Sequence, residues 1–206
     1  IQYGNVTRPT HYNTSWDFAR FEVCAHKWID ISENGYGISV LNNCKYGCDI
    51  HNGEIGLTML KSAVYPNPDA DKEHHSFTWS IAPHEGGWRE GNTVAKAYVL
   101  NNPYQTAVKE NEGGNLPASY SFVQADKENV VIEAVKKAED SDAVIVRLYE
   151  CYNRRGQTTL TFPRPVKRAV ICNMLEEETG EVLNVNGSQV ELELKPYEIE
   201  TVKVEF

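Results

Sequence analysis

Residues 21–41 read FEVCAHKWIDISENGYGISVL, and this stretch decides the fold class that the sequence predicts. In its first half Phe21, Val23, Ala25 and Ile29 share one parity. The other parity carries polar and mixed side chains, including Trp28. A period of two is typical of a β-strand that buries one face. The sequence therefore predicts a strand that runs without a break from Phe21 to about residue 32.

Two Asn-Gly pairs predict tight turns between strands. Asn34-Gly35 follows the first predicted strand, and Asn52-Gly53 lies further along the chain. Both residue types adopt positive φ at little energetic cost, as two-residue hairpin turns require. We therefore expect hairpins at both sites, with a returning strand over 36–41 after the first and a strand over 55–61 after the second.

The rest of the chain continues the pattern of short strands separated by turn residues. Further strands are predicted at 76–82, 121–124, 130–136, 143–150, 156–162, 166–174, 190–194 and 198–206. The stretch 94–100 has helical spacing of its apolar residues but is short, and it stays ambiguous. Strands with turn signals about every ten residues are typical of β-sandwiches. The predicted fold class is all-β. The polar, glycine-rich stretch 109–117 divides it into lobes 1–111 and 114–206.

Composition excludes several classes of function. The net charge of −9 argues against nucleic acid as a partner, because nucleic-acid binding needs a cationic surface. No apolar run approaches the roughly 20 residues that span a bilayer, so no membrane partner is expected. Five cysteines without framework spacing favour reduced thiols and a cytoplasmic location. The chain begins at Ile1 rather than Met, and we expect it to be a fragment.

Several residue clusters have chemical potential, and each has a plainer interpretation. Asp69 and Asp71 with His74 and His75 are metal-ligand types, but a solvated loop explains them better. Asp17, Glu22 and Asp30 are glycosidase carboxylates by type only. Cys24 or Cys151 with a histidine could form a nucleophile and base, although strand cysteines are usually small core residues.

Aromatic residues are the remaining binding signal. Those that could stack on sugar rings are Trp16, Trp28, Trp88, Tyr36 and Tyr46. The favoured interpretation is that they fill the core, least so for Trp28, because it lies off the apolar parity. The sequence contains no nucleophile elbow, P-loop, dinucleotide fingerprint or HExxH motif.

Long ordered strings resemble one known family. The strings are RPTHYNTSWDFARFEVCAHKWIDIS (8–32), GYGISVLNNCKYG (35–47), LKSAVYPNPDAD (60–71) and HSFTWSIAPH (75–84). They resemble the C-terminal β region of glycoside hydrolase family 38 α-mannosidases, in the branch with cytosolic and bacterial enzymes. AVIVRLYE (143–150) and YEIETVKV (197–204) resemble strands of that branch's terminal β-sandwich.

The resemblance implies retaining α-mannosidase chemistry that is carried elsewhere in the polypeptide. In that family an N-terminal barrel-like domain holds zinc, an aspartate nucleophile and the acid/base carboxylate. Those motifs have no match between Ile1 and Phe206, so we expect no catalytic residue and no metal ligand here, and an inactive isolated chain. The implied architecture is the rear of a mutarotase-like β-supersandwich at 1–111, followed by a complete small β-sandwich at 114–206.

The resemblance also implies a supporting role beside a sugar site. In this family the β region packs against the catalytic domain, and some members add a basic residue to the rim of the substrate site. The matching residue is Lys61, although lysine offers a point charge where the family pattern has a planar arginine fork. Trp28 and Tyr46 are further rim candidates. Expected partners are the N-terminal catalytic domain and mannosides.

Two alternatives stay open beside the supporting role. One is a free-standing carbohydrate-binding or protein-interaction module, and the other is an autonomous hydrolase. Because lobe 1–111 lacks the earlier strands of its sandwich, its exposed sheet edges make a homo-oligomer possible.

Overall fold

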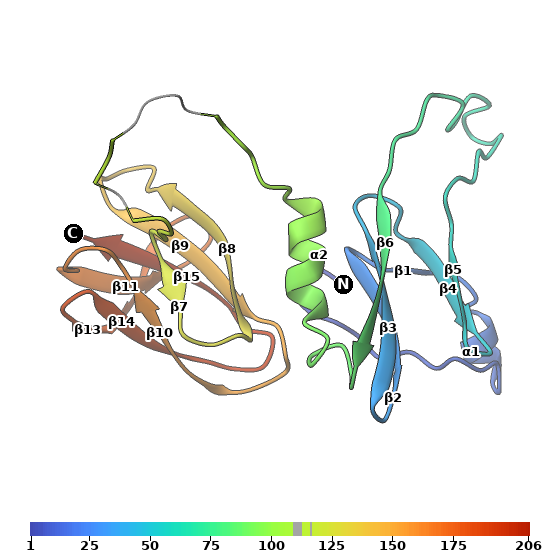
Figure 1. The fold of residues 1–206 in the computed structure, drawn as a ribbon, viewed down its shortest axis with the longest axis horizontal. Helices are drawn as coiled ribbons and strands as arrows, with labels where there is room; N and C mark the ends of the chain where they lie inside the picture. The colour runs from blue at the N-terminus through green and yellow to red at the C-terminus, as the bar shows by residue number, and fades with distance from the viewer. Residues whose placement is uncertain (109–112, 116) are drawn as a thin grey trace. The chain divides into compact units, whose positions relative to one another are not determined.

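The computed structural model describes residues 1–108, 113–115 and 117–206 (Figure 1). Two units are evident: one comprises Ile1–Gln2 and Val6–Val108, the other Tyr3–Asn5 and Lys109–Phe206. Most of the boundary expected at 109–117 lies outside the described residues. The regular structure in both units is dominated by antiparallel strands, which confirms the all-β fold class.

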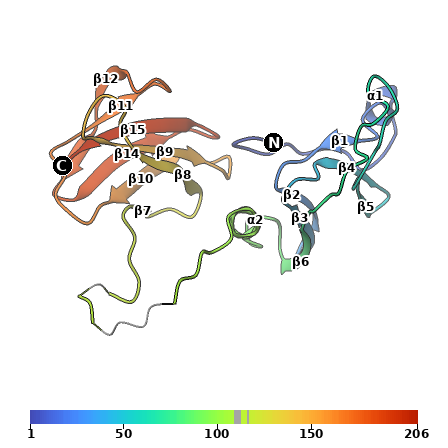
Figure 2. The same ribbon diagram turned by 90° about the horizontal axis from the view of Figure 1, so that it is seen from above.

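The first unit contains two three-stranded sheets and two helices. One sheet has the order β1-β4-β5 and the other β2-β3-β6. The elements are α1 (Ser15–Phe18), β1 (Val23–Cys24), β2 (Trp28–Glu33), β3 (Tyr36–Asn42), β4 (Gly47–His51), β5 (Glu54–Leu57), β6 (Trp79–Glu85) and α2 (Thr93–Asn101). Both views place α2 beside β3 (Figures 1 and 2).

Both predicted hairpin turns are confirmed. Glu33 pairs with Tyr36 across the first turn, where Gly35 has a φ of 95°. In the second turn Asn52 and Gly53 have φ values of 52° and 81°. These values lie in the left-handed region that a tight hairpin turn needs, so the local residue types fix both turns.

The predicted continuous strand from Phe21 is wrong, because the chain bends in its middle. Lys27 has a φ of 67°, and the N–H of Trp28 donates to the carbonyl of His26 at 2.8 Å. Before the bend β1 pairs with β4, and after it β2 pairs with β3. The apparent period of two thus spans two strands in different sheets.

Strand β6 exposes the parity that carries its large apolar side chains. Trp79 is 47% exposed and Ile81 56% exposed. Ile81 lies in one cross-strand row with Ile29 and Val40, which are 7% and 9% exposed. This face of the sheet is therefore covered at β2 and β3 but exposed at β6.

Helix α2 resolves the ambiguity of residues 94–100. Val94 and Ala97, three residues apart, are buried, and the helix contacts β3 and β2. The side-chain amide of Asn101 donates to the carbonyl of Asn42 at 3.0 Å and so attaches the end of the helix to β3. Residues 94–100 form a helix because their apolar side chains, spaced for one helical face, pack against one face of the sheet.

The second unit is a β-sandwich of a four-stranded and a five-stranded sheet. The sheet orders are β13-β14-β10-β7 and β12-β11-β15-β9-β8. The strands are β7 (Gln124–Ala125), β8 (Val130–Lys137), β9 (Val144–Glu150), β10 (Gly156–Thr161), β11 (Arg168–Cys172), β12 (Glu178–Val182), β13 (Asn184–Asn186), β14 (Gln189–Leu194) and β15 (Ile199–Glu205). All but β12 and β13 overlap predicted strands.

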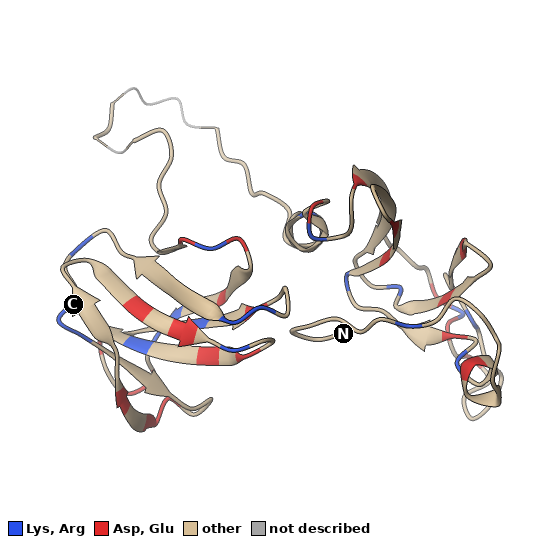
Figure 3. Cartoon of the chain, turned by 90° about the horizontal axis from the view of Figure 1, so that it is seen from below, with Lys and Arg blue, Asp and Glu red and all other residues tan. Residues whose placement is uncertain are grey.

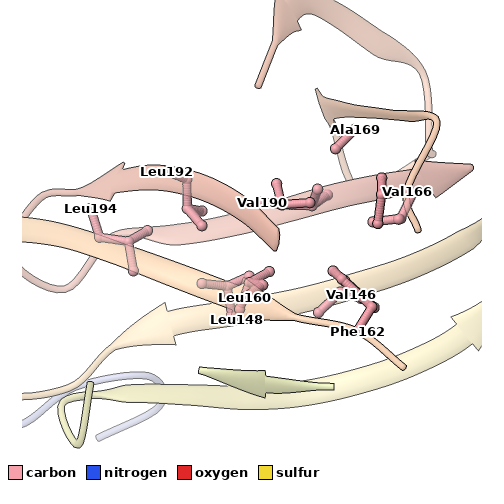
Figure 4. Close-up of a cluster of buried hydrophobic side chains, with 11 residues drawn as sticks. Val146, Leu148, Leu160, Phe162, Val166, Ala169, Val190, Leu192 and Leu194 are labelled. Atoms are coloured by element: carbon pink, nitrogen blue, oxygen red, sulfur yellow. The ribbon is translucent and has the colours of Figure 1, made fainter. Parts of the chain in front are cut away.

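Alternating side chains from both sheets fill the sandwich (Figure 4). Leu148 from β9 and Leu160 from β10 are fully buried. Along β14 the burial alternates strictly, with Val190, Leu192 and Leu194 inside. This is the pattern of a strand with one face in a core and one in water.

Charges of both signs are interspersed along the strands of the sandwich (Figure 3). Arg168 forms ion pairs with Glu178 at 2.6 Å and Glu205 at 3.3 Å. Its neighbours raise the pKa of the guanidinium, chiefly through the hydrogen bonds to Glu178. An alternating outer surface of this kind suits a solvated sheet better than a polyanion-binding face.

A segment near the start of the chain completes one end of the sandwich. The hydroxyl of Tyr197 donates to the side-chain oxygen of Asn5 at 3.0 Å, and the ring of Tyr3 packs edge-on against Tyr149. The buried carboxylate of Glu150 accepts from the N–H groups of Tyr152 and Tyr197. Residues 3–5 thus belong to the second unit, although the sequence assigned them to the first lobe.

The buried apolar residues are distributed very unevenly between the units. Only six of those described lie in the first unit: Ile29, Val40, Leu41, Cys48, Val94 and Ala97. The other 19 all belong to the second unit. The second unit thus has a core of its own, whereas the first leaves much of its apolar surface uncovered. Among the described helices, none is long and apolar enough to cross a membrane.

Candidate functional site

Lys61 lies in the connection between β5 and β6, where its side chain is exposed. Trp28 lies at the start of β2, and Tyr46 directly precedes β4 in the other sheet. No hydrogen bond or ring contact of the described residues joins any two of the three. The three rim candidates therefore do not form one ready-made cluster.

Trp28 is half-buried beneath a second tryptophan. Its ring lies 5.2 Å from that of Trp88, at an interplanar angle of 34°, and the guanidinium of Arg89 lies 4.1 Å from the Trp88 ring. Next to Trp28, the ammonium of Lys27 lies 4.0 Å from the ring of Tyr98 on α2. These aromatic and cationic contacts give Trp28 a packing role at the edge of α2.

Tyr46 lies beside a thiol–imidazole pair. Its ring packs at 69° against His26, with the centroids 4.6 Å apart. Nε2 of His26 lies 3.6 Å from Sγ of Cys24. His26 Nδ1 is buried without a hydrogen-bond partner among the described residues, so none of them orients the imidazole as nucleophilic catalysis requires. Cys151, the other cysteine considered, is buried in the sandwich.

The main buried polar cluster of the first unit joins Asp30 to His84. Their side chains are 5% and 3% exposed, and Nε2 of His84 lies 2.7 Å from Oδ2 of Asp30. The hydroxyl of Ser39 donates to the same oxygen at 2.7 Å and lies 2.6 Å from the hydroxyl of Thr93. Ser32 donates to the other carboxylate oxygen.

This cluster resembles a catalytic triad in composition but not in geometry. Ser39 and Asp30 both contact the same nitrogen of His84, whereas a triad uses the two nitrogens separately. Asp30, His84, Ser39 and Thr93 are also enclosed between the sheet and the start of α2, whereas Ser32 is exposed. The cluster therefore joins β2, β3, β6 and α2, and Asp30 is excluded as a solvent-facing glycosidase carboxylate.

The other two candidate carboxylates also have structural partners. Asp17 closes a capping box with Thr14 at the start of α1, and the hydroxyl of Thr14 chiefly lowers the pKa of this carboxyl. Glu22 accepts from the hydroxyl of Thr58 at 2.5 Å. Both carboxylates therefore stabilise local structure, as a cap and as a link between neighbouring segments.

The loop that carries the metal-ligand residue types holds them apart. Asp69 lies 3.4 Å from the ammonium of Lys72, the Asp71 carboxylate accepts from the N–H of Ser62, and His75 contacts the carbonyl of Asp71. Within the described residues, no three His, Cys, Asp or Glu side chains are grouped to hold a metal ion. The donor set of the described chain therefore does not fit a zinc ion.

The core interpretation is wrong for three of the aromatic candidates. Trp16 on α1 is 75% exposed, Tyr36 at the start of β3 is 49% exposed, and Tyr46 is 36% exposed. Sequence reasoning also missed His84 and Thr93 as partners of Asp30. They lie 54 and 63 positions after it, and no local pattern connects them.

A pocket of about 230 Å³ opens in the terminal sandwich. Its floor contains Ile171, Leu183 and Leu192, and its rim carries several glutamates, among them Glu200. Burial raises the pKa of the Glu200 carboxyl, with smaller contributions from Glu198 and Glu181. The rim also holds Arg155 and Lys195, which pair with Glu193 and Glu198.

Two family models match the chain. Residues 1–69 match the glycosyl hydrolases family 38 C-terminal domain, and residues 129–202 match the glycosyl hydrolases family 38 C-terminal beta sandwich domain. Together the two matches span more than half of the chain; the second lies within the second unit, and the first lies in the first unit except for residues 3–5.

Characterised relatives share clear sequence identity with this chain. Alpha-mannosidase G of Dictyostelium discoideum is 39% identical over 98% of this chain, and human Alpha-mannosidase 2C1 is 36% identical over 97%. The alpha-mannosidase of Saccharomyces cerevisiae is 32% identical over all of it. The chain spans only about a fifth of the length of these relatives.

A solved structure has the same fold. An alpha-mannosidase from Enterococcus faecalis V583 superposes with a TM-score of 0.77 over 98% of this chain and 23% of its own, at 19% identity. Together with the two family models, these likenesses show that the chain belongs to the C-terminal region of the glycoside hydrolase family 38 α-mannosidases.

Proposed function

We propose that this chain is the C-terminal region of a retaining α-mannosidase, and that its first unit braces the catalytic part of that enzyme. The observation that carries the proposal is the surface of the first unit. Trp16, Phe18 and Phe21 are 60–75% exposed, and Val64 and Tyr65 are 73% and 87% exposed. Large exposed apolar surface is rare on soluble monomers and marks contact with another protein surface.

Chain length supports the same proposal. The relatives are about five times as long as this chain and carry the name α-mannosidase. The substrate is then a terminal α-D-mannosyl residue, and the zinc ion would be bound by the catalytic part, since no described residues here fit it. The proposed location, by analogy with the family branch, is the cytoplasm.

Within this proposal Lys61 lies at the rim of the sugar site. It is an exposed cation without an acidic partner among the described residues, so its charge is available to a substrate hydroxyl. Trp28 and Tyr46 stay weaker rim candidates, because each already packs against a neighbouring ring. Trp28 under Trp88 is also less suited to a free-standing sugar-binding module, which needs an open aromatic platform.

The test begins with the coding sequence upstream of Ile1. Zinc-ligand and nucleophile motifs there, with turnover of p-nitrophenyl-α-mannoside by the whole polypeptide and none by the 206-residue chain, support the proposal. Turnover by the short chain, or an upstream sequence of another kind, contradicts it. Mannose binding by the 206-residue chain in a titration would favour the free-standing module.

The role of Lys61 is tested in the whole enzyme. Lys61→Ala is expected to raise KM by about two- to fivefold, the size of a single exposed charge interaction. Lys72→Ala is the matched control. Lys72 is an exposed cation in the same connection between β5 and β6, and its ammonium pairs with Asp69. Equal KM values for the two variants would show that Lys61 does not contribute to the rim of the sugar site.

A further inference from the structure

The connection between β5 and β6 contains a closed loop from Ser62 to Asp71. The N–H of Ser62 donates to the Asp71 carboxylate at 3.3 Å, and its hydroxyl donates to the carbonyl of Ala70 at 3.2 Å. These bonds bring the two ends of the loop together. Figure 1 shows the connection projecting beyond the ends of β5 and β6. Compact loops with joined ends are frequently functional.

The loop is also fixed internally and at its base. The N–H of Asp69 donates to the side-chain oxygen of Asn67 at 3.0 Å, which makes a local turn near the tip. At the base, Nε2 of His75 lies 2.9 Å from the carbonyl of Asp71, and Nδ1 lies 3.4 Å from the ammonium of Lys45. Lys45 precedes β4, so His75 ties the loop to the sheet.

Both residues that close the loop adopt an uncommon backbone conformation. Ser62 has a φ of 48° and Asp71 a φ of 59°. Non-glycine residues in the left-handed region are uncommon and persist where their surroundings hold them, often at functional sites. Here the hydrogen bonds from Ser62 to Asp71 and to Ala70 hold the two ends, so the shape of the loop is set before any partner binds.

The tip of this preformed loop is apolar and unpacked. Val64 is 73% exposed and Tyr65 87% exposed. Residues 62–68, SAVYPNP, contain no charge, although 24% of the chain is charged. Fixing an apolar tip in water brings no benefit to the isolated fold. It does reduce the entropy that is lost when the tip inserts into another surface.

We propose that the loop Ser62–Asp71 is a docking finger, with Val64 and Tyr65 as the contact residues that insert into the catalytic part of the same enzyme. This inference rests on the proposed function and identifies its contact. The occupant is argued from length, because the relatives extend about four-fifths beyond the region matched here. Lys61 directly precedes the finger, so docking would also fix its position.

The test uses the whole enzyme and compares two equally exposed tyrosines. Tyr65→Asp places a charge on the finger, and Tyr104→Asp does so at a tyrosine that is 82% exposed outside it. Tyr65→Asp is expected to shorten the half-life of thermal inactivation about tenfold, a change of about 1.4 kcal/mol. Tyr104→Asp and the ring-preserving Tyr65→Phe are expected to stay within about twofold of the unchanged enzyme.

Measurements on the 206-residue chain distinguish docking from packing within the first unit. In that chain Tyr65→Asp should leave the unfolding midpoint unchanged, and a fall there would show that the tip packs within its own unit. A dimer of the short chain that Tyr65→Asp dissociates would identify a second copy as the occupant and overturn the proposal, as would equal half-lives for Tyr65→Asp and Tyr104→Asp. If the whole polypeptide lacks mannosidase activity, the proposed function fails, while its unfolding midpoint still tests docking.

Discussion

Replacing Asp30 with asparagine should destabilise the first unit selectively. The carboxylate of Asp30 accepts hydrogen bonds from Ser32, Ser39 and His84, which come from β2, β3 and β6. Asparagine has almost the same shape but offers one acceptor oxygen and a donor amide. Its oxygen can still accept from Ser39 and His84 while its amide faces the exposed hydroxyl of Ser32, so the buried hydrogen bonds persist but lose the charge of the carboxylate.

The size of the effect follows from burial. His84 and Asp30 are 3% and 5% exposed at the side chain, and Ser39 is fully buried. Hydrogen bonds to a charged group contribute about 1.5–3 kcal/mol and neutral ones about 0.5–1.5 kcal/mol, so each of the two buried bonds weakens by about 1 kcal/mol. We expect Asp30→Asn to lower the free energy of unfolding of the first unit by about 2 kcal/mol. Because that unit has a small core, its total free energy of unfolding is expected to be small.

The tryptophans make the assay selective. All four, Trp16, Trp28, Trp79 and Trp88, lie in the first unit, so their fluorescence in a urea titration reports on that unit alone. Far-UV circular dichroism also reports on the sandwich. Asp30→Asn should move the fluorescence transition to lower urea and leave the sandwich transition in place.

The matched control is Glu33→Gln, which removes the same charge from an exposed position on the same strand. Its fluorescence midpoint should stay within the small range typical of surface substitutions, about 0.5 kcal/mol. If Asp30→Asn behaved like Glu33→Gln, the buried cluster would have no stabilising role. If both transitions moved together, the two units would not unfold independently.

Three further substitutions test other parts of the structure. Gly91→Ala should lower the stability measured by fluorescence by about 1–3 kcal/mol, the usual effect of overpacking, because its methyl group would lie 2.5 Å from Cγ of His84. Leu148→Ala should destabilise the sandwich by about 2–5 kcal/mol, seen by circular dichroism but not by tryptophan fluorescence. Glu200→Gln should raise the melting temperature of the sandwich at about pH 7 but not at about pH 3. The pKa of Glu200 is raised, so folding disfavours its ionised form. The ionised carboxyl therefore lowers the stability of the sandwich at high pH, and this loss vanishes at low pH, where the carboxyl is protonated in both the folded and the unfolded state. An equal gain for Glu200→Gln at both pH values would contradict this reasoning.

The features that the sequence predicted correctly are those with local causes. Asn34-Gly35 and Asn52-Gly53 form turns because their own φ preferences allow it. The strict alternation of β14 also needs no distant information, since a strand with one buried face must place apolar residues at every second position. The same logic predicted most of the sandwich and the all-β fold class.

The incorrect predictions have distant causes. Lys27 adopts a positive φ, and the chain changes sheets there, because β4 and β3 offer different partners on either side of the bend. On β6 the large apolar side chains Trp79 and Ile81 are exposed, because nothing in the described part of the first unit covers them.

The candidate sites divide in the same way. Residue types alone identified Lys61, Trp28 and Tyr46 as rim candidates, and the family strings identified the class of enzyme. Only the tertiary structure showed that Asp30 is enclosed with His84, and that the loop after Lys61 is closed by Ser62 and Asp71. Sequence determines local backbone preference and alternation, whereas burial and side-chain pairing depend on residues that only folding brings together.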